Sequence, residues 1–488
     1  MSDLNSQELR IVGFLCNWCS YGGADTAGVA RAKQPTDLRI IRLPCSGRVD
    51  PLFVLKALFN GADGVLVSGC HPRDCHYSSG NFYARRRLQV VKEFLPILGI
   101  DSRRFEYTWV SASEGQRWQE VVTKFTAQIH ELGKATTFAE IEPKAQTLPP
   151  LESRPQSLQP LNCGQDAPLA SLKAAIAERL VELDLVIGWQ EGRDKAHAVP
   201  LFMREKADVE RLIFGPFNVQ NLATYLPEYK GKKIGIVVKA CDVRSVMELL
   251  QENLIEREQV TLFTIPCGGT FDMGGVEAKL GRYENIDKVK INATTVEITA
   301  DGHEHTFDIS KDAQGKCLSC TCRLSSQADV ILGGEADPNA KPFDPTFVPR
   351  ELALLESLSL EDRMAFWKWT ISRCIRCGAC RNSCPMCVCR DHCVSDTRDP
   401  HWLTQADTAT EKLFFQVVHA THLAGRCTEC GECQRSCPMG IPILALREKL
   451  NRIIYELFSG YQAGQDPTQV PPLLAYLVEE PQIKEREW

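Results

Sequence analysis

The sequence predicts an α/β domain with a parallel sheet near the amino end, an α+β domain in the middle and a mostly α-helical domain near the carboxyl end. Short apolar runs alternate with amphipathic stretches in the first part of the chain, a pattern typical of parallel sheets. A proline-rich stretch separates this part from the next. All but one of the 22 cysteines gather in three groups, one in each predicted domain.

The composition excludes several classes of protein. A chain of 488 residues is expected to form about three domains, and its net charge of −6 argues against a nucleic-acid partner. No apolar run approaches the roughly 18 residues of a membrane-spanning helix. The first residues, MSDLNSQELR, do not resemble a secretory signal, so we expect a cytoplasmic protein. Because the cytosol keeps thiols reduced, the cysteines predict metal ligation rather than disulfides.

Composition also sets the expected boundaries. Six prolines lie between residues 141 and 168, among polar residues that cannot form a core, and Cys163 stands alone there. We expect a front domain over 1–135, a linker over 136–168, a middle domain over 169–345, a rear domain over 346–460 and a tail over 461–488.

The front domain alternates buried strands with capped helices. Asp50 can cap a helix that has Pro51 at its first position and Gly61 just beyond its end. Ser113 and Gln116 form a capping-box pattern before a second amphipathic helix. The predicted strands are Ile11–Leu15, Leu38–Leu43 and Gly64–Val67.

Three front-domain cysteines follow these strands. Cys16, Cys45 and Cys70 each come at or just after a strand end, and the carboxyl ends of parallel strands share one edge of a sheet. Cys19 and Cys75 lie in the following loops, within reach of the same edge. Buried structural cysteines would explain one or two of these positions but not three equivalent ones. The sequence therefore predicts a metal site at this edge.

The residues around these cysteines carry a family resemblance. The segments CNWCSYGGAD (16–25), LPCSGRVDP (43–51) and GADGVLVSGCHPRDCHY (61–77) resemble the delta subunit of the methyl-viologen-reducing hydrogenases. The resemblance covers roughly residues 10–132. It implies one 2Fe–2S cluster, which passes electrons between a hydrogenase or dehydrogenase and a heterodisulfide-reductase-like flavoprotein.

The five cysteines exceed the four ligand places of such a cluster. We favour Cys16, Cys45, Cys70 and Cys75, because three of them end strands. A set in which Cys19 replaces Cys16 is the alternative.

The rear domain contains the most specific motif in the chain. Residues 374–385 read CIRCGACRNSCP and residues 427–438 read CTECGECQRSCP, and each is the C-x2-C-x2-C-x3-C-P run of bacterial ferredoxins. In such pairs the fourth cysteine of each run ligates the other cluster. Zinc sites use a different spacing. The sequence therefore predicts a ferredoxin-like dicluster domain, with one 4Fe–4S cluster on Cys374, Cys377, Cys380 and Cys437, and another on Cys427, Cys430, Cys433 and Cys384.

An insert separates the two runs. It adds Cys387, Cys389 and Cys393, and then an apolar helical stripe over Glu411–Leu423 that is most simply core packing. The three extra cysteines are compatible with a further iron site, a zinc site or buried apolar positions.

The middle domain places single cysteines after strands. An apolar strand over Lys232–Lys239 leads to Cys241, and a second strand over Val260–Ile265 leads to Cys267. A C-x2-C pair follows farther along, with Cys322 close behind. The predicted ligands of a third 4Fe–4S cluster are Cys241, Cys267, Cys317 and Cys320. Apolar and polar residues alternate over residues 295–309, with Asp301-Gly302 at the centre, and this pattern predicts a hairpin.

A second resemblance lies here. The segments VVKACDVRSVMELL (237–250) and FTIPCGG (263–269) resemble the iron–sulfur beta subunits of deazaflavin-dependent hydrogenases and formate dehydrogenases. That family binds FAD, so the resemblance admits FAD in this chain. No G-x-G-x-x-G follows a strand, and the glycines of CGGTFDMGG (267–275) fit a phosphate contact or a plain turn equally well.

Two functions are consistent with these observations. The first is an electron-transfer subunit that relays electrons to or from a heterodisulfide-reductase-like flavoprotein, with a hydrogenase or dehydrogenase at the other end. The second is a flavin-containing subunit that itself oxidises or reduces a deazaflavin or nicotinamide coenzyme. Because no general acid, general base or nucleophile stands out, we favour the first.

Overall fold

The front part of the chain forms a four-stranded sheet in which every neighbouring pair is parallel, as predicted. The computed structural model describes residues 8–149, 160–281, 285–340, 344–389, 392–395 and 402–486. The sheet order is β2-β1-β3-β4, with β1 at Ile11–Cys16, β2 at Leu38–Leu43, β3 at Gly64–Gly69 and β4 at Phe105–Trp109. The helices are α1 (Ser20–Val29), α2 (Pro51–Phe59), α3 (Gly80–Phe94) and α4 (Gly115–Leu132).

The local signals in the front domain act largely as expected. The Asp50 carboxylate accepts a hydrogen bond from the Leu52 amide at 2.9 Å, and α2 ends before Gly61, whose φ is +88°. The capping-box prediction is displaced by one residue: α4 has Glu114 at its N-cap and no side-chain cap. Strand β4 was not predicted. Helices α1 and α4 contact each other and share a core with one face of the sheet, while α2 and α3 belong to a core on the other face.

The middle part contains two sheets. The larger has the order β12-β8-β7-β5-β6, and only β6 is antiparallel to its neighbour. Its strands are β5 (Leu185–Glu191), β6 (Ala198–Met203), β7 (Ile234–Val237), β8 (Val260–Thr264) and β12 (Val330–Ile331), with α5 (Ala167–Arg179), α6 (Lys206–Val209) and α7 (Ala240–Gln251). Because α7 connects the parallel strands β7 and β8, this sheet is closer to α/β than to the expected α+β.

The smaller sheet is antiparallel, in the order β11-β10-β9. Its strands are β9 (Ile286–Ile291), β10 (Thr295–Ala300) and β11 (His303–Asp308), and α8 (Met273–Leu280), α9 (Ile309–Asp312) and α10 (Lys316–Ser319) flank it in the chain. Asp301 and Gly302 form the turn between β10 and β11 with φ of +46° and +80°. The predicted hairpin is confirmed. Positive φ at both turn positions is typical of the type I′ turn, whose twist matches that of the two flanking strands.

The rear part is helical. No strand lies beyond β12 in the portion of the chain that the structure describes. Its helices are α11 (Arg350–Ser357), α12 (Leu360–Ser372), α13 (Ala379–Asn382), α14 (Ala409–His422), α15 (Glu432–Arg435) and α16 (Leu444–Leu457). Among the described helices, none combines the length and apolar character that crossing a bilayer requires.

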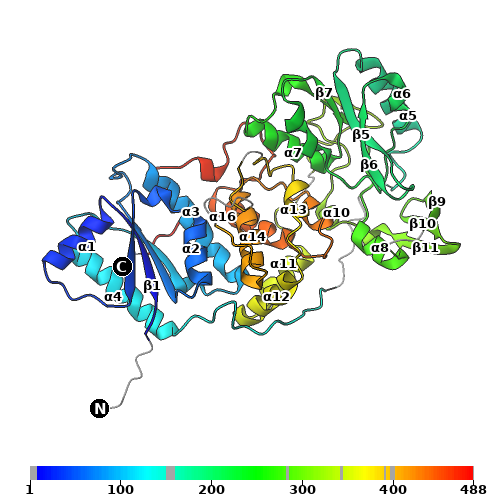
Figure 1. Cartoon of the computed structure of the whole chain (residues 1–488). Coiled ribbons are helices and arrows are strands. Elements are labelled where there is room, and N and C mark those ends of the chain that lie inside the picture. The colour runs from blue at the N-terminus through cyan, green and yellow to red at the C-terminus, as the bar shows by residue number, and fades with distance from the viewer. Residues whose placement is uncertain are drawn as a thin grey trace.

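The order of the three parts in space differs from their order in the chain. Figure 1 shows the rear helices between the front sheet and the middle sheet. One core joins front residues to rear residues: Phe59 packs edge-on against Phe414, with ring centroids 6.2 Å apart. A second core joins the middle sheet to rear residues such as Met386 and Leu423. The rear part therefore shares buried surface with both of the others.

Segments at the ends of the predicted linker and tail also pack. Phe138 and Ile141, in the predicted linker, are buried in the core shared by front and rear. The tail returns to α3, where Arg86 Nη1 donates to the carbonyls of Pro472 and Ala475 at 2.7 and 3.0 Å. Residues 150–159 of the predicted linker lie outside the described residues.

Trp367 provides a test of the front–rear junction. Its side chain is fully buried, and its indole N–H donates to the Ile97 carbonyl of the front domain at 2.8 Å. We expect Trp367→Ala to lower the free energy of unfolding by about 3–5 kcal/mol, because it leaves a cavity and an unpaired carbonyl. Trp369→Ala, on the same helix but half-buried, should have a much smaller effect. Equal shifts of the denaturation midpoint in the two variants would contradict this role.

Candidate metal centres

The front-domain thiols converge at the carboxyl edge of the parallel sheet. Cys16 is the last residue of β1, and Cys70 directly follows β3. Their sulfur atoms lie 3.4 Å apart, and those of Cys45 and Cys75 lie 3.7 Å apart. A hydrogen bond from the Asn81 amide to the Cys70 carbonyl at 3.1 Å fixes the start of the loop. The structure thus brings together the four cysteines that we favoured.

Hydrogen bonds make the Cys16 thiol unusually acidic. The Cys70 thiol and the backbone amides at the start of α1 donate to it and lower the pKa of Cys16 to about 5. Burial raises the pKa of Cys45 to about 11. Cys70 also forms a hydrogen bond with Cys19, so the structure places all five sulfurs in one group and does not separate Cys19 from Cys16.

The absence of a side chain at Gly80 lets the backbone approach these sulfurs closely. A Cβ atom at Gly80 would lie only 2.5 Å from Cys45 Sγ and 3.4 Å from Cys75 Sγ. The missing side chain lets the start of α3 pass directly over the thiols. The donor chemistry of the gathered thiols fits an iron–sulfur cluster.

The two rear runs have the same backbone conformation. Arg376 and Glu429, at equivalent positions, have φ of +52° and +56°, and Gly378 and Gly431 have φ of +74° and +79°. Each run then forms one helical turn, α13 or α15. The sequence repeat therefore produces a structural repeat. In each run, two residues with left-handed backbone conformation lie on either side of the second cysteine and turn the chain there.

Electrostatic coupling groups the rear thiols across the two runs. Burial is the main cause of the raised pKa of Cys374, and the Cys437 thiol of the other run raises it further. Burial likewise raises the pKa of Cys384, with Cys430 and Cys433 contributing. These are the pairings that the crossed ligation predicts. Cys377 is exposed. Among the described residues, no three Cys, His, Asp or Glu side chains converge tightly enough to hold a single metal ion, and the ligand assignment remains a prediction.

The middle thiols line one pocket. Cys241 follows β7 at the start of α7, Cys267 follows β8, and the C-x2-C pair comes from α10. The cysteines in the pocket are Cys241, Cys267, Cys317, Cys320 and Cys322. Burial, together with Cys267, raises the pKa of Cys322 to about 11. The structure thus places Cys322 in the same pocket as the four predicted ligands.

Two buried lysines accompany these thiols. Lys239 is almost fully buried, lies 2.7 Å from the Asp242 carboxylate and packs over the Trp189 ring at 4.4 Å. Lys316 lines the pocket itself. Burial disfavours its charge, but Cys241 and Asp242 raise the pKa of Lys316 above its usual range. Sequence reasoning missed both lysines, although Lys316 directly precedes the C-x2-C pair.

The insert cysteines form a separate small group. Burial, followed by repulsion from Cys393 and Cys389, raises the pKa of Cys387 to about 11. Cys387 and Cys389 line a cleft beside Cys384. The insert residues 390–391 and 396–401 lie outside the described residues.

Known families match all three parts. Residues 11–133 match the methyl-viologen-reducing hydrogenase delta subunit, residues 231–342 match the C terminus of the coenzyme F420 hydrogenase/dehydrogenase beta subunit, and residues 370–441 match a 4Fe-4S dicluster domain. The fold and the thiol groups define an iron–sulfur protein. Through its front domain, the chain belongs to the methyl-viologen-reducing hydrogenase delta subunit family.

Individual relatives match the front domain. The vhc iron-sulfur subunit of the F420-non-reducing hydrogenase from Methanococcus voltae is 50% identical over 129 residues, which are 26% of this chain and 90% of that protein. One subunit of the ferredoxin:CoB-CoM heterodisulfide reductase from Methanosarcina mazei is 49% identical over 128 residues, which are 26% of this chain but only 16% of that one.

A solved structure shows a slight likeness. One chain of the F420-reducing [NiFe] hydrogenase complex from Methanosarcina barkeri superposes with a TM-score of 0.28 at 17% sequence identity, covering 38% of this chain and 70% of that chain. This likeness is too small to support a conclusion.

The crossed ligation gives a direct prediction for the rear cysteines. Cys374→Ser and Cys437→Ser should weaken the same electron paramagnetic resonance signal of the reduced protein, because both residues belong to one predicted cluster. Cys384→Ser should weaken the other signal instead. Different signals lost in Cys374→Ser and Cys437→Ser would exclude the crossed assignment.

The presence of a fifth thiol in the middle pocket gives a second prediction, which concerns the ligands of the third cluster. We expect Cys320→Ser to lose about four irons per chain, because Cys320 is one of the four predicted ligands. Cys322→Ser, two residues away in the same pocket, should retain them. Iron analysis of the two purified variants distinguishes these outcomes, and the reverse result would make Cys322 the ligand.

Proposed function

We propose that this chain is an iron–sulfur electron-transfer subunit of a cytoplasmic multi-subunit oxidoreductase. It would connect hydrogenase or dehydrogenase subunits with a heterodisulfide-reductase-like flavoprotein subunit. The observation that supports this most is the presence of three thiol groups in one chain, each within a part that matches a redox family. Bound iron–sulfur clusters would supply one-electron chemistry at each group.

The proposed cluster content is one 2Fe–2S cluster in the front domain, two 4Fe–4S clusters in the rear domain and one 4Fe–4S cluster in the middle domain. The five gathered front sulfurs and the close backbone approach at Gly80 support the first. The two equivalent runs support the rear pair. The pocket of five cysteines with a buried lysine supports the last.

The shared cores support an order for electron flow. Cys374 and Cys380, from one predicted rear set, belong to the core that contains front-domain residues. Cys427 belongs to the core of the middle sheet, and Cys384 packs against it. The proposed sequence of sites is therefore front thiols, first rear set, second rear set and middle thiols, consistent with the arrangement in Figure 1.

The family matches support the partners. The front domain resembles a separate protein of a hydrogenase and also a short segment of a larger heterodisulfide reductase chain. A domain that occurs in both contexts is suited to a junction between them. We place the heterodisulfide-reductase-like partner at the front domain and the hydrogenase or dehydrogenase at the middle domain.

The alternative is a flavin enzyme. The match to the beta-subunit family over residues 231–342 favours it, since that family is named for coenzyme F420 hydrogenase and dehydrogenase. In this case FAD would bind to the middle domain, and the chain itself would oxidise or reduce a deazaflavin or nicotinamide coenzyme.

Iron and flavin analysis of the anaerobically purified full-length chain tests the proposal. We expect about 14 irons per chain with matching acid-labile sulfide, and no flavin in the acid supernatant. We also expect no turnover of a deazaflavin or nicotinamide coenzyme by the isolated chain. Bound flavin with turnover of roughly 1–1000 per second would establish the alternative. A chain containing only zinc would contradict both.

A further inference from the structure

Arg447 is a buried cation without a carboxylate partner. It lies in the first turns of α16, and only 2% of the residue is exposed. Its Nη2 donates to His419 Nδ1 at 2.7 Å, while Nε and Nη1 have no hydrogen-bond partner. None of the described carboxylates forms an ion pair with it. Burying an uncompensated charge is costly, so a compensating negative charge is expected nearby.

The neighbouring histidine does not supply that charge. Burial lowers the pKa of His419 well below its usual value, and the positive charge of Arg447 lowers it further. His419 is therefore neutral and accepts the hydrogen bond at Nδ1. Because the acceptor is uncharged, the whole positive charge of the guanidinium remains to be balanced by other groups.

Cysteines from both ferredoxin runs lie beside the two helices that carry this pair. One turn after Arg447 on α16, Asn451 donates to the Cys427 carbonyl at 2.7 Å, and one turn before His419 on α14, Gln416 donates to Cys380 Sγ at 3.8 Å. Burial disfavours the charge of Arg447, yet surrounding thiols raise its pKa above the usual range. These thiols are Cys433, Cys384, Cys427 and Cys380. Three belong to the second predicted rear set, and Cys380 belongs to the first. Arg447 thus lies at the junction of the two sets.

We propose that Arg447 is a positioning residue whose buried charge raises the reduction potentials of both rear clusters. The inference rests on the proposed function, since it requires that the two rear clusters are present. Reduction adds one electron to a thiolate-ligated cluster, and no bond forms or breaks. The reduced site is more negative by one charge, so a fixed cation beside its ligands stabilises the reduced state more than the oxidised state.

The second rear set should respond more strongly. Its cysteines Cys433, Cys384 and Cys427 interact most strongly with the charge of Arg447, followed by Cys380 of the first set. The low dielectric of a buried site makes the interaction larger than it would be at the surface. Charge and hydrogen bonding near cluster sulfurs are among the factors that set such potentials.

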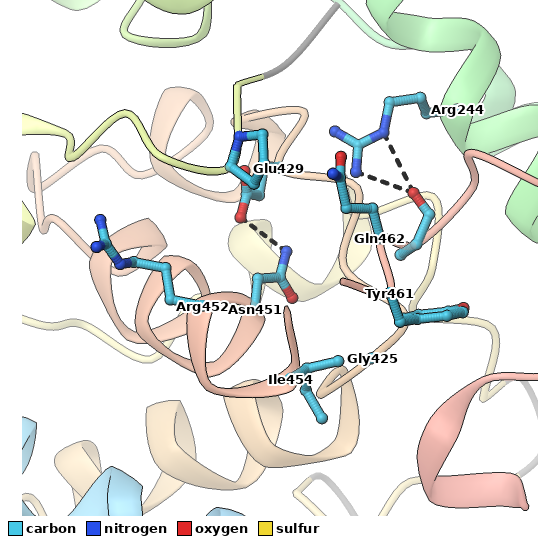
Figure 2. A pocket seen from close by; sticks show the side chains of 10 residues that line it. Arg244, Gly425, Glu429, Asn451, Arg452, Ile454, Tyr461 and Gln462 are labelled. Carbon is cyan, nitrogen blue, oxygen red and sulfur yellow. Dashed lines mark hydrogen bonds between the residues drawn. The ribbon is translucent and has the colours of Figure 1, made fainter. Parts of the chain in front are cut away.

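Arg452 provides a matched control on the same helix. Figure 2 shows Arg452 and Asn451 beside a cavity that Glu429 also lines, and Asn451 donates to Glu429 Oε1 at 2.8 Å. The charge of Arg452 acts on the carboxyls of Glu429 and Glu448, whose raised pKa values are due mainly to burial. Arg452→Met therefore removes an arginine from α16 that interacts with carboxyl groups.

The test is a redox titration of the full-length chain followed by electron paramagnetic resonance. Cys374→Ser and Cys384→Ser first assign the two rear signals. We expect Arg447→Met and Arg447→Gln to lower both potentials, with at least a tenfold fall in the one-electron equilibrium constant of the second set, which is a shift of about 59 mV. The two potentials in Arg447→Lys should lie between those of these variants and those of the wild type. Arg452→Met should leave both potentials unchanged.

Each other outcome is decisive. Unchanged potentials in both neutral variants would overturn the inference, as would an equal shift in Arg452→Met. Loss of the rear iron from both Arg447→Met and Arg447→Gln would make Arg447 an assembly residue and would also overturn it. A wild-type chain without the two rear signals would instead contradict the proposed function.

Discussion

The architecture depends on the need to balance the negative charge of thiolates inside a protein. A buried charge is tolerated only where an opposite charge or hydrogen-bond donors face it. Each thiol group in this chain meets that need differently. Backbone amides at the start of α1 serve the front group, Lys316 serves the middle group and Arg447 serves the rear sets. The compensating groups are as much a part of each centre as the cysteines.

A buried arginine of the middle domain fixes that domain against the chain that follows it. Arg244, on α7 of the middle domain, donates through Nε and Nη2 to the Ala463 carbonyl at 3.2 and 2.9 Å and through Nη1 to the Thr428 carbonyl at 3.3 Å. Figure 2 shows the hydrogen bonds from this side chain to the tail. Since Thr428 lies within the second ferredoxin run, these bonds join the backbone around the second rear set to the helix that follows Cys241.

Much of this could be predicted from local sequence. The parallel front sheet, the β10–β11 hairpin and the two ferredoxin runs follow from short-range patterns of strand, turn and cysteine spacing. The helical stripe that begins at Glu411 corresponds to α14. Each of these patterns is contained in a few consecutive residues, so it can be recognised without knowledge of the fold.

The rest depends on contacts between residues far apart in the chain. Strands β4, β5 and β6 carry no distinctive motif, and the α+β expectation for the middle domain failed to anticipate its largely parallel sheet. Cys322 resembles a spare thiol until the structure places it in the pocket. Arg447 follows Cys437 by a short interval, but its electrostatic interactions with Cys380 and Cys384 cross the insert. No periodicity in the sequence distinguishes it from a surface arginine.

The spatial order has a consequence for how the chain can work. A relay needs its sites to be neighbours in space, and sequence order would have placed the middle thiols between the front and rear groups. Cys374 and Cys380 of the first rear set instead lie in the core shared with the front domain, as does Cys433 of the second set, while Cys427 and Cys384 lie with the core of the middle sheet. Cys380 and Cys433 also interact electrostatically. The rear sets therefore lie between the front and middle thiols, and the charge of Arg447 acts on cysteines of both sets.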